Sequence, residues 1–338
     1  MSRVVEHLAE LTGFRDRDLL DVTLVGALKD LLQPQAVAVY RSVGEPGQER
    51  WFTRARQGPG DAAAMADPPW IDLESLPPLA AHPQRHACLL QQQPQTLPGP
   101  PVVSCFALGG DDEPAGVLEL HTEQALSGEA LRLVGAMLRV VRNFQGLLDY
   151  SERDTLTGLL NRKTFDENFL RHALQPPASA AGGRRSKPGA GSWLGVIDID
   201  HFKKVNDSYG HLIGDEVLLL LSRLMRSCFR FQDRLYRFGG EEFVALVRCE
   251  SAGDAASAFE RLRARVQQHV FPQVGQITVS VGFTQVRPGD TPSGAFERAD
   301  KAVYHAKQAG RNQVADHAAL VLAGQLNDPA RDSDVELF

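Results

Sequence analysis

The chain has few cysteines and no long hydrophobic run. Its four cysteines, at positions 88, 105, 228 and 249, form no CxxC pair and have no His partner at metal-ligand spacing, so we expect buried thiols. The longest aliphatic run covers residues 217–221, far short of the roughly 20 residues of a membrane helix. Residues 1–7 lack the apolar core of a signal peptide. We therefore expect a cytoplasmic protein with no membrane partner.

The chain also lacks an excess of positive charge. Residues 1–150 carry 12 Lys and Arg against 19 Asp and Glu, a net charge of −7, whereas residues 151–338 carry 24 against 23, a net charge of +1. Binding to nucleic-acid phosphates needs a cationic surface, so we expect no nucleic-acid partner. With 43% hydrophobic and 23% charged residues among 338, the composition is that of a globular protein long enough for two domains.

Residues 1–126 are predicted to form an α+β domain with long loops. A helical pattern over residues 18–32 precedes a strand pattern at 36–40. Two more strand patterns, at 102–108 and 116–121, follow a middle section rich in Pro and Gln.

Residues 127–153 contain no proline and are predicted to form a connecting helix. Its seam positions recur at spacings of three and four: Leu131, Val134, Leu138, Val141, Gln145 and Leu148. This spacing predicts a short parallel coiled coil that leaves the first domain. The alternative is an amphipathic helix that lies on its own domain.

Residues 154–316 alternate helical and strand patterns and are predicted to form the second domain. Within it, residues 176–192 are rich in Pro, Gly, Ala and Ser and cannot bury enough apolar surface to fold, so we expect a mobile loop. Residues 317–338 become polar and are predicted to form a flexible tail.

Two stretches of the second domain combine features that a plain core strand would not gain from. RFGGEEF, residues 237–243, places two glycines and two acids inside a strand pattern, which predicts a hairpin turn open to close approach by a ligand. WLGVIDI, residues 193–199, is a buried-strand pattern that ends in acids. If the strands are neighbours, Asp198 and Glu241 converge, and two carboxylates with a backbone carbonyl suit Mg²⁺.

Cations that could hold phosphate accompany these acids. Lys203 follows the first acids, and Lys307 and Arg311 are four residues apart, on one face of a predicted helix. Taken singly, each feature is more often structural than functional. A glycine pair is usually a turn, a DxD is usually part of a solvated loop, and a cation pair is usually on the surface. Together they favour a site for a metal ion with phosphate.

Five ordered blocks between residues 154 and 312 resemble the GGDEF domains, which are diguanylate cyclases. The blocks are DTLTGLLNRK, DIDHFKKVNDSYGHLIGDEVL, RFGGEEF, TVSVGF and ADKAVYHAKQAGRN, with the signature in its GGEEF variant. The resemblance implies an α+β fold of βαββαβ order, related to the palm-like core of nucleotidyl cyclases. It also implies condensation of two GTP into cyclic di-GMP and two pyrophosphates, with Mg²⁺ as cofactor and Mn²⁺ as an alternative.

The resemblance assigns catalytic and metal-binding roles. Asp198 and Glu241 match the metal-binding acids, with the carbonyl of Ile199 as a further ligand. Glu242 matches a position tied to catalysis, where it orients or deprotonates the attacking 3′-hydroxyl; the general base stays open. The metal requirement does not extend to Asp200.

The resemblance also assigns a substrate pocket. Its members are Phe202, Lys203, Asn206, His211, Asp215, Lys307 and Arg311. The three cations match phosphate-binding positions, and Asn206 and Asp215 match the residues that read guanine. A carboxylate accepts hydrogen bonds from N1–H and the N2 amino group of guanine, which adenine does not offer, so Asp215 favours GTP. His211 is assigned a structural or ribose-side role.

A homodimer and a second nucleotide site follow from the same resemblance. Each domain holds one GTP, so two domains must face each other, and the connecting helix and first domain would hold the homodimer together. Arg230 and Asp233 form an RxxD that matches the family's product-inhibition site for cyclic di-GMP. Arg261 is the expected additional arginine, with Arg263 as the alternative.

The first domain resembles a GAF sensor domain in outline, and PAS-like domains share that outline. No motif identifies its ligand. Two other functions remain: a binding module that senses GTP or cyclic di-GMP without turnover, and a dimerising scaffold. Catalysis is favoured because the acids and the phosphate cations are all present.

Overall fold

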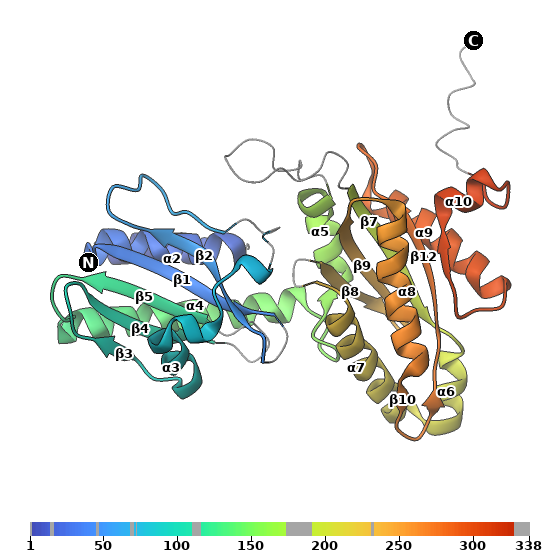
Figure 1. The fold of residues 1–338 in the computed structure, drawn as a ribbon, viewed down its shortest axis with the longest axis horizontal. Coiled ribbons are helices and arrows are strands. Elements are labelled where there is room, and N and C mark those ends of the chain that lie inside the picture. Colours follow the sequence, from blue (N-terminus) through green and yellow to red (C-terminus); the bar gives the residue numbers. More distant parts are fainter. Residues whose placement is uncertain are drawn as a thin grey trace, which may run out of the picture. The chain divides into compact units, whose positions relative to one another are not determined.

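The computed structural model describes residues 2–13, 17–44, 47–67, 71, 73–109, 116–173, 191–230 and 233–327. The chain divides into two compact units, Met1–Ser151 and Glu152–Phe338 (Figure 1). The boundary falls at the end of the connecting helix, which therefore belongs by its contacts to the N-terminal unit. Of the expected mobile loop, residues 176–190 lie outside the described residues, and residues 191–192 already belong to a strand.

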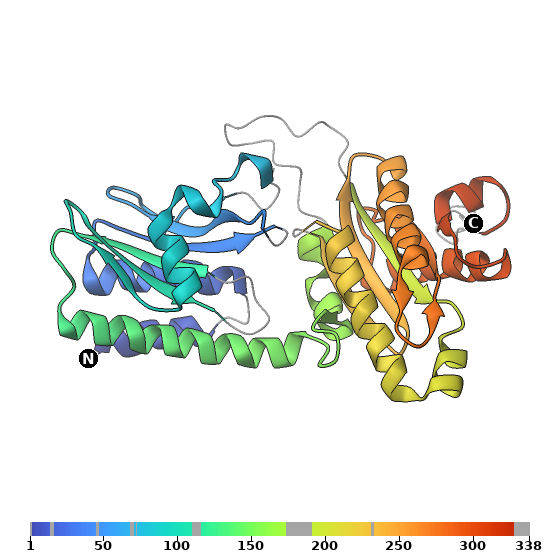
Figure 2. The same cartoon turned by 60° about the horizontal axis from the view of Figure 1, so that its bottom comes forward.

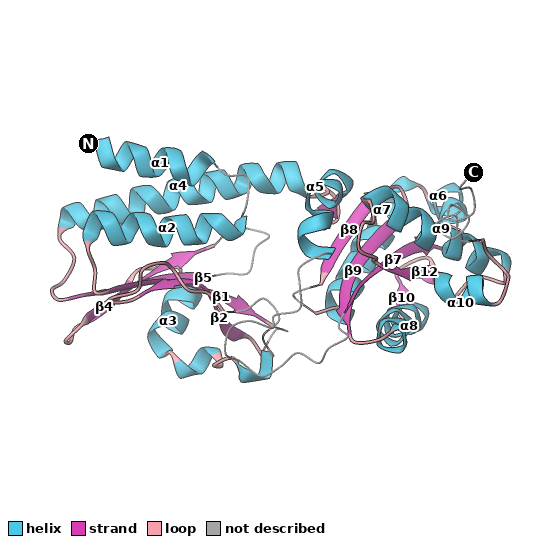
Figure 3. Cartoon of the chain, turned by 90° about the horizontal axis from the view of Figure 1, so that it is seen from above, coloured by secondary structure: helices cyan, strands magenta, loops and turns pink. Residues whose placement is uncertain are grey.

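The N-terminal unit is built on a five-stranded antiparallel sheet in the order β2-β1-β5-β4-β3. Its strands are β1 (Ala36–Val43), β2 (Arg50–Gln57), β3 (Gln95–Leu97), β4 (Val102–Leu108) and β5 (Gly116–Thr122). Helices α1 (Ser2–Gly13), α2 (Arg17–Leu32) and α4 (Gly128–Glu152) lie on one face, and α3 (Pro83–Gln91) lies on the other (Figure 3). The 3₁₀ turns η1 (Leu73–Ser75) and η2 (Leu79–Ala81) precede α3.

The predicted seam of α4 packs on its own unit. Val134, Met137, Leu138 and Val141 join the core between the sheet and α2, and Figure 2 shows α4 as one continuous helix in this layer. Leu131, the first seam residue, is 44% exposed. The seam residues Val134, Leu138 and Val141 therefore pack as the alternative predicts, in an amphipathic helix on its own domain.

The C-terminal unit is built on a six-stranded sheet in the order β13-β12-β7-β9-β8-β6. The strands are β6 (Leu160–Asn161), β7 (Gly191–Ile199), β8 (Arg234–Gly239), β9 (Glu242–Cys249), β12 (Val279–Gln285) and β13 (Val314–Asp316); β10 (Val270–Phe271) and β11 (Gly275–Gln276) form a separate ribbon. The helices are α5 (Arg162–Ala173), α6 (Phe202–Tyr209), α7 (His211–Cys228), α8 (Ala252–Gln268), α9 (Pro292–Gln308) and α10 (His317–Leu322).

The expected βαββαβ order is confirmed in this unit. It runs from β7 through α6 and α7 to the β8-β9 hairpin, then through α8 to β12, and these four strands pair antiparallel. The expected flexible tail differs at its start, because residues 317–322 form α10. Asp316 caps this helix by accepting a hydrogen bond from the Ala318 amide, and His317 is fully buried.

Side chains alternate between the two faces of the sheet. On β7, Ile197 and Ile199 join the core under α6, α7 and α8, whereas Leu194 and Val196 join the core under α5 and α9. This period of two carries Asp198 to the α5 and α9 side. Among the helices that the structure describes, none combines the length and the hydropathy needed to cross a membrane.

Candidate active site

Neighbouring strands bring the predicted acids together. Strands β7 and β9 pair antiparallel, and Asp198 lies directly opposite Glu242. The residue Glu241 belongs to the turn just before β9. The expected neighbour relation of the two strands is therefore confirmed, and cross-strand register makes Glu242 the direct partner of Asp198.

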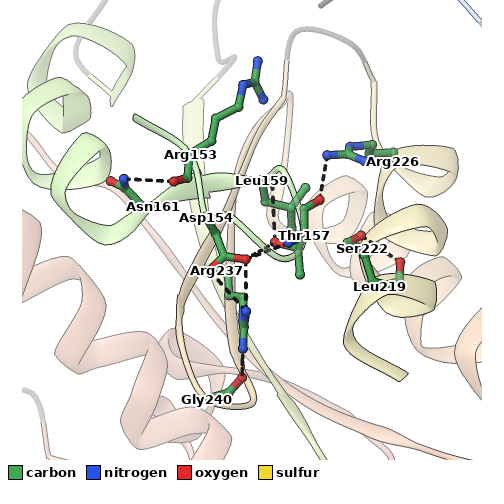
Figure 4. Close-up of polar contacts among 10 residues, drawn as sticks. All are labelled: Arg153, Asp154, Thr157, Leu159, Asn161, Leu219, Ser222, Arg226, Arg237 and Gly240. Carbon is green, nitrogen blue, oxygen red and sulfur yellow. Dashed lines mark hydrogen bonds and ion pairs between the residues drawn. The ribbon is translucent and has the colours of Figure 1, made fainter. Parts of the chain in front are cut away.

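The glycine pair forms the expected hairpin turn. Gly239 has φ 141° and Gly240 has φ 53°, values that glycine adopts without the steric cost of a Cβ. Arg237 holds this turn with its guanidinium: Nη2 donates to the Gly240 carbonyl at 3.0 Å, and Nη1 donates to the two carboxylate oxygens of Asp154 at 3.0 and 3.1 Å (Figure 4).

Asp154 is itself fixed by the segment that follows α4. The Thr157 amide and hydroxyl both donate to its Oδ1, at 2.8 and 2.7 Å. Arg226 of α7 donates to the Thr157 carbonyl at 2.9 Å (Figure 4). The start of the C-terminal unit is therefore tied to both the β8-β9 hairpin and α7, a connection that the sequence motifs alone do not reveal.

Asp198 is a buried acid with one satisfied oxygen. Its Oδ2 pairs with Lys307 Nζ of α9 at 2.7 Å, whereas its Oδ1 is buried without a hydrogen-bond partner in the described part of the chain. Burial raises the pKa of Asp198, and the Lys307 ammonium opposes this rise. An unsatisfied buried carboxylate oxygen is costly unless a cation or donor meets it.

The two glutamates share this electrostatic state. Burial raises the pKa of Glu241 and of Glu242, and the nearby Asp198 carboxylate adds to both rises. Three acids that resist ionisation together, beside one orphaned oxygen, have the chemistry that a divalent cation would satisfy. Within the described ranges, protein side chains alone provide no cluster of three or more His, Cys, Asp or Glu able to hold a metal ion, so such an ion would need further oxygen ligands.

Asp300 is a residue of this site that sequence reasoning missed. It lies seven residues before Lys307 on α9, which places both on one helix face. After burial and the Asp198 charge, the Asp300 carboxylate is the next cause that raises the pKa of Glu242. The i, i+7 spacing was a signal that could have found it.

Asp200 accepts several hydrogen bonds and holds the turn that follows α9. Its buried carboxylate accepts hydrogen bonds from Thr278 Oγ1 at 2.6 Å, Ser280 Oγ at 2.7 Å and the Asn312 amide at 3.0 Å. Arg311 and Asn312 both have positive φ, 64° and 47°, which is uncommon for residues with side chains. Asp200 therefore supports the turn that carries Arg311, a predicted phosphate ligand.

The remaining predicted pocket residues of this region lie on α6 and on the first turns of α7. Lys203, His211 and Asp215 are exposed, and Asn206 is half-buried. The side chain of Phe202 is 5% exposed and belongs to the core under α6, α7 and α8, so only its backbone could contact a substrate. Its ring is a packing element there, because the helix turns this position toward the sheet.

The residues predicted for product inhibition lie around one turn. Asp233 Oδ2 accepts from the Arg230 amide at 2.8 Å, which closes the RxxD turn. Arg261 donates from Nε and Nη2 to the Cys228 carbonyl, at 3.2 and 2.7 Å, and its charge lowers the pKa of Asp233 against the dominant effect of burial. Arg263 instead contacts Glu260 and Asn312, so the geometry favours Arg261.

Comparison with known proteins finds similarity in the C-terminal unit. Residues 151–313 match the family model described as "Diguanylate cyclase, GGDEF domain". The chain is 37% identical over 202 residues to diguanylate cyclase DgcP of Pseudomonas aeruginosa, covering 57% of this chain and 29% of that protein. It is 38% identical over 166 residues to diguanylate cyclase DgcZ of Escherichia coli, covering 48% of this chain and 52% of that protein.

Among solved structures, the GGDEF domain of DgcB from Caulobacter crescentus in complex with c-di-GMP matches with 33% identity and a TM-score of 0.44, covering 50% of this chain and 96% of that one. The chain spans about half or less of the length of the curated relatives named above. The family match covers residues 151–313 and agrees with the five ordered sequence blocks, so this part of the chain is similar to GGDEF domains.

Proposed function

We propose that the protein is a diguanylate cyclase that converts two GTP into cyclic di-GMP and two pyrophosphates. The observation that carries this proposal is the cross-strand pair of Asp198 and Glu242 beside the glycine turn, with Lys307 on Asp198. Relatives that bear the name diguanylate cyclase support the same activity.

The reaction forms two phosphodiester bonds. In each, the 3′-oxygen of one GTP attacks the α-phosphorus of the other, the bond to the β-phosphate oxygen breaks, pyrophosphate leaves and the hydroxyl proton passes to a base. Lys203, Lys307 and Arg311 would bind the phosphates, and Asn206 and Asp215 the guanine. Glu242, beside Asp198, would orient or deprotonate the hydroxyl.

The acids fit a divalent metal. Asp198, Glu241 and the Ile199 carbonyl would hold Mg²⁺, or Mn²⁺ in its place, and the bound ion would stabilise charge on the phosphates. The orphaned Asp198 Oδ1 supports this assignment. Lys307 would then serve both the acid and the triphosphate.

Two chains are needed, because one domain supplies one GTP and each GTP must meet the other. Val134, Leu138 and Val141 of the α4 seam are in the core of the N-terminal unit, so a homodimer through this helix would use its remaining positions. The N-terminal unit would act as the sensor, of GAF or PAS-like type, and cyclic di-GMP would inhibit at Arg230, Asp233 and Arg261.

The test is incubation of the purified full chain with Mg²⁺ and GTP, with ATP in parallel, and chromatographic identification of the products. We expect cyclic di-GMP from GTP alone, and none from Glu242→Ala. Glu250→Ala, an exposed glutamate beyond the far end of β9, is the matched control and should retain activity. No product from wild-type protein stripped of bound nucleotide would contradict the proposal.

A further inference from the structure

A glycine in helix α7 makes an unusually close approach to another helix. Gly214 is buried in the first turn of α7 and donates its amide hydrogen bond to the Gly210 carbonyl at 3.2 Å. Glycine is less favourable than alanine within a helix, so a buried helical glycine calls for a packing reason. A Cβ at this position would lie 2.0 Å from Asn206 Oδ1 and 3.1 Å from its Cγ. The Asn206 amide therefore occupies the space that any other residue at this position would need.

This contact joins α6 to the part of α7 that carries Asp215. Gly210, with φ 85°, turns the chain between the two helices. Its amide donates to the Asn206 carbonyl at 2.9 Å, and its carbonyl accepts from Gly214. The backbone thus fixes Asn206 against α7, one residue away from Asp215.

We propose that Gly214 is a positioning residue for guanine selectivity. Its missing side chain lets the Asn206 amide lie against α7, so that Asn206 and Asp215 address one base together. An amide offers a donor and an acceptor, and a carboxylate offers acceptors, which match the O6, N1–H and N2 amino groups of guanine and not the edge of adenine. The proposal rests on the proposed function, in which this site holds GTP; Gly214 itself touches no nucleotide.

The first test is the nucleotide preference of Gly214→Ala in the full chain. Binding of the non-reactive α,β-methylene analogues of GTP and ATP is measured by calorimetry with Mg²⁺ present. We expect the affinity for the GTP analogue to fall about tenfold or more, the range of one lost bidentate base contact, with the affinity for the ATP analogue within about twofold of wild type. A GTP affinity equal to wild type, or an equal loss for both analogues, would overturn the proposal.

Gly253→Ala is the matched control. Gly253 also lies in a helix, α8, and its Cβ would meet only Ser251 Oγ, at an ordinary 3.7 Å. This variant should leave both affinities at their wild-type values. A loss of GTP preference in Gly253→Ala would mean that selectivity responds to helix changes in general, against the proposal.

The second test is a stability cycle that needs no nucleotide. In wild-type protein Gly214→Ala should lower the Tm, because the added methyl group would displace the Asn206 amide. In an Asn206→Ala background the same change should raise the Tm, because alanine favours the helix and Phe202 Cζ, at 3.3 Å, has to move only a few tenths of an ångström. Additive Tm shifts would refute the contact. Absence of cyclic di-GMP synthesis with the coupling and the GTP preference intact would instead count against the proposed function.

Discussion

Asp200 shows how a buried acid can fix a turn that is distant in the sequence, here the turn that carries Arg311. Its carboxylate accepts hydrogen bonds from Thr278, just before β12, and from Ser280 of β12. It also accepts one from the Asn312 amide, in the turn that follows α9. These partners are 78 to 112 residues away in sequence. Because the Asp200 carboxylate satisfies one buried and two partly buried donors, its loss leaves more than one of them unpaired.

Asp200→Asn is expected to lower the free energy of unfolding by about 1–3 kcal/mol. The amide has only one acceptor oxygen, whereas the carboxylate serves donors with both of its oxygens. Urea denaturation measures the change. Asp207→Asn, at an exposed acid of α6, is the control and should stay near wild type; equal stability of the two variants would contradict this role of Asp200.

Glu119 makes the N-terminal unit sensitive to acid. Burial raises its pKa, but hydrogen bonds from His121 and Arg85 outweigh burial and hold the pKa at about 2, below the ordinary 4.5. A lowered pKa stabilises the fold above the unfolded value, and this stabilisation is lost as pH falls from about 4.5 toward about 2.

We therefore expect wild-type stability in urea to fall over that pH window, and Glu119→Gln to be less stable at pH 7 with a weaker pH dependence below 4.5. Glu123→Gln, at an exposed acid of the same unit, should keep the wild-type profile. Parallel pH profiles for wild type and Glu119→Gln would show that Glu119 is not the responsible group.

Single residues differ in how far sequence could predict them. The positions of Asp198 and of the glycine pair in a strand end and a turn were predictable, because the strand pattern and the neighbouring acids are local features of the sequence. Asp200 and Gly214 were not, because their roles lie in contacts whose geometry only the folded chain defines. The packing of the Phe202 ring was not predictable either: a motif gives the position, and the helix phase decides that the ring faces the core.

At the scale of elements, the planar guanidinium of Arg237 connects the segment that follows α4 to the β8-β9 hairpin. Arg237→Lys keeps the charge but cannot span Asp154 and the Gly240 carbonyl together. We expect cyclase turnover to fall about tenfold or more, the effect of misplacing a reacting group, while circular dichroism stays unchanged. Arg223→Lys, exposed on α7, is the control; equal rates in the two variants would remove the supporting role of Arg237.

Helix α4 allows the core and coiled-coil interpretations to be separated. Leu138 is in the core of the N-terminal unit, so Leu138→Ala should cost about 2–5 kcal/mol of stability. Leu147→Ala, at a 67% exposed position, should cost far less. Sedimentation tests the coiled-coil interpretation. If Leu138→Ala changes only the oligomeric state and not the stability of the unit, the seam packs against a helix of a second chain.

Elements were more predictable than their partners. The patterns for β4, β5, β7 and α4 gave strands and a helix close to those observed, because hydrophobic period is a local signal. The same period suits a helix packed on its own sheet and a helix packed on a second copy, so the partner of α4 could not be predicted. Helix α10 was not predicted from the sequence after residue 316, because a helix of six residues has little hydrophobic periodicity.

At the scale of the whole molecule, dimerisation and product inhibition are the remaining predictions. If each active site needs two chains, as proposed, the specific rate of cyclic di-GMP synthesis should rise with protein concentration. A specific rate that is constant across dilution, with a monomer in sedimentation, would contradict the two-chain mechanism.

Arg230→Ala should make the rate less sensitive to added cyclic di-GMP. Arg230 and Asp233 form the turn beside Arg261, and arginine is suited to bind guanine through two parallel hydrogen bonds. Rates are compared with wild type at several product concentrations, with Arg263→Ala as the control that should keep inhibition. An unchanged inhibition curve for Arg230→Ala would place the inhibitory site elsewhere.

The last buried residue of α4 and the first fixed residue of the C-terminal unit lie close together in the sequence. Leu148 is the last buried residue of α4, and Asp154 is already held by Thr157 and Arg237. A junction placed between them would leave the buried contacts of α4 and the hydrogen bonds of Asp154 in place. Exchanges of the N-terminal unit between related chains should therefore join the two sequences inside this interval.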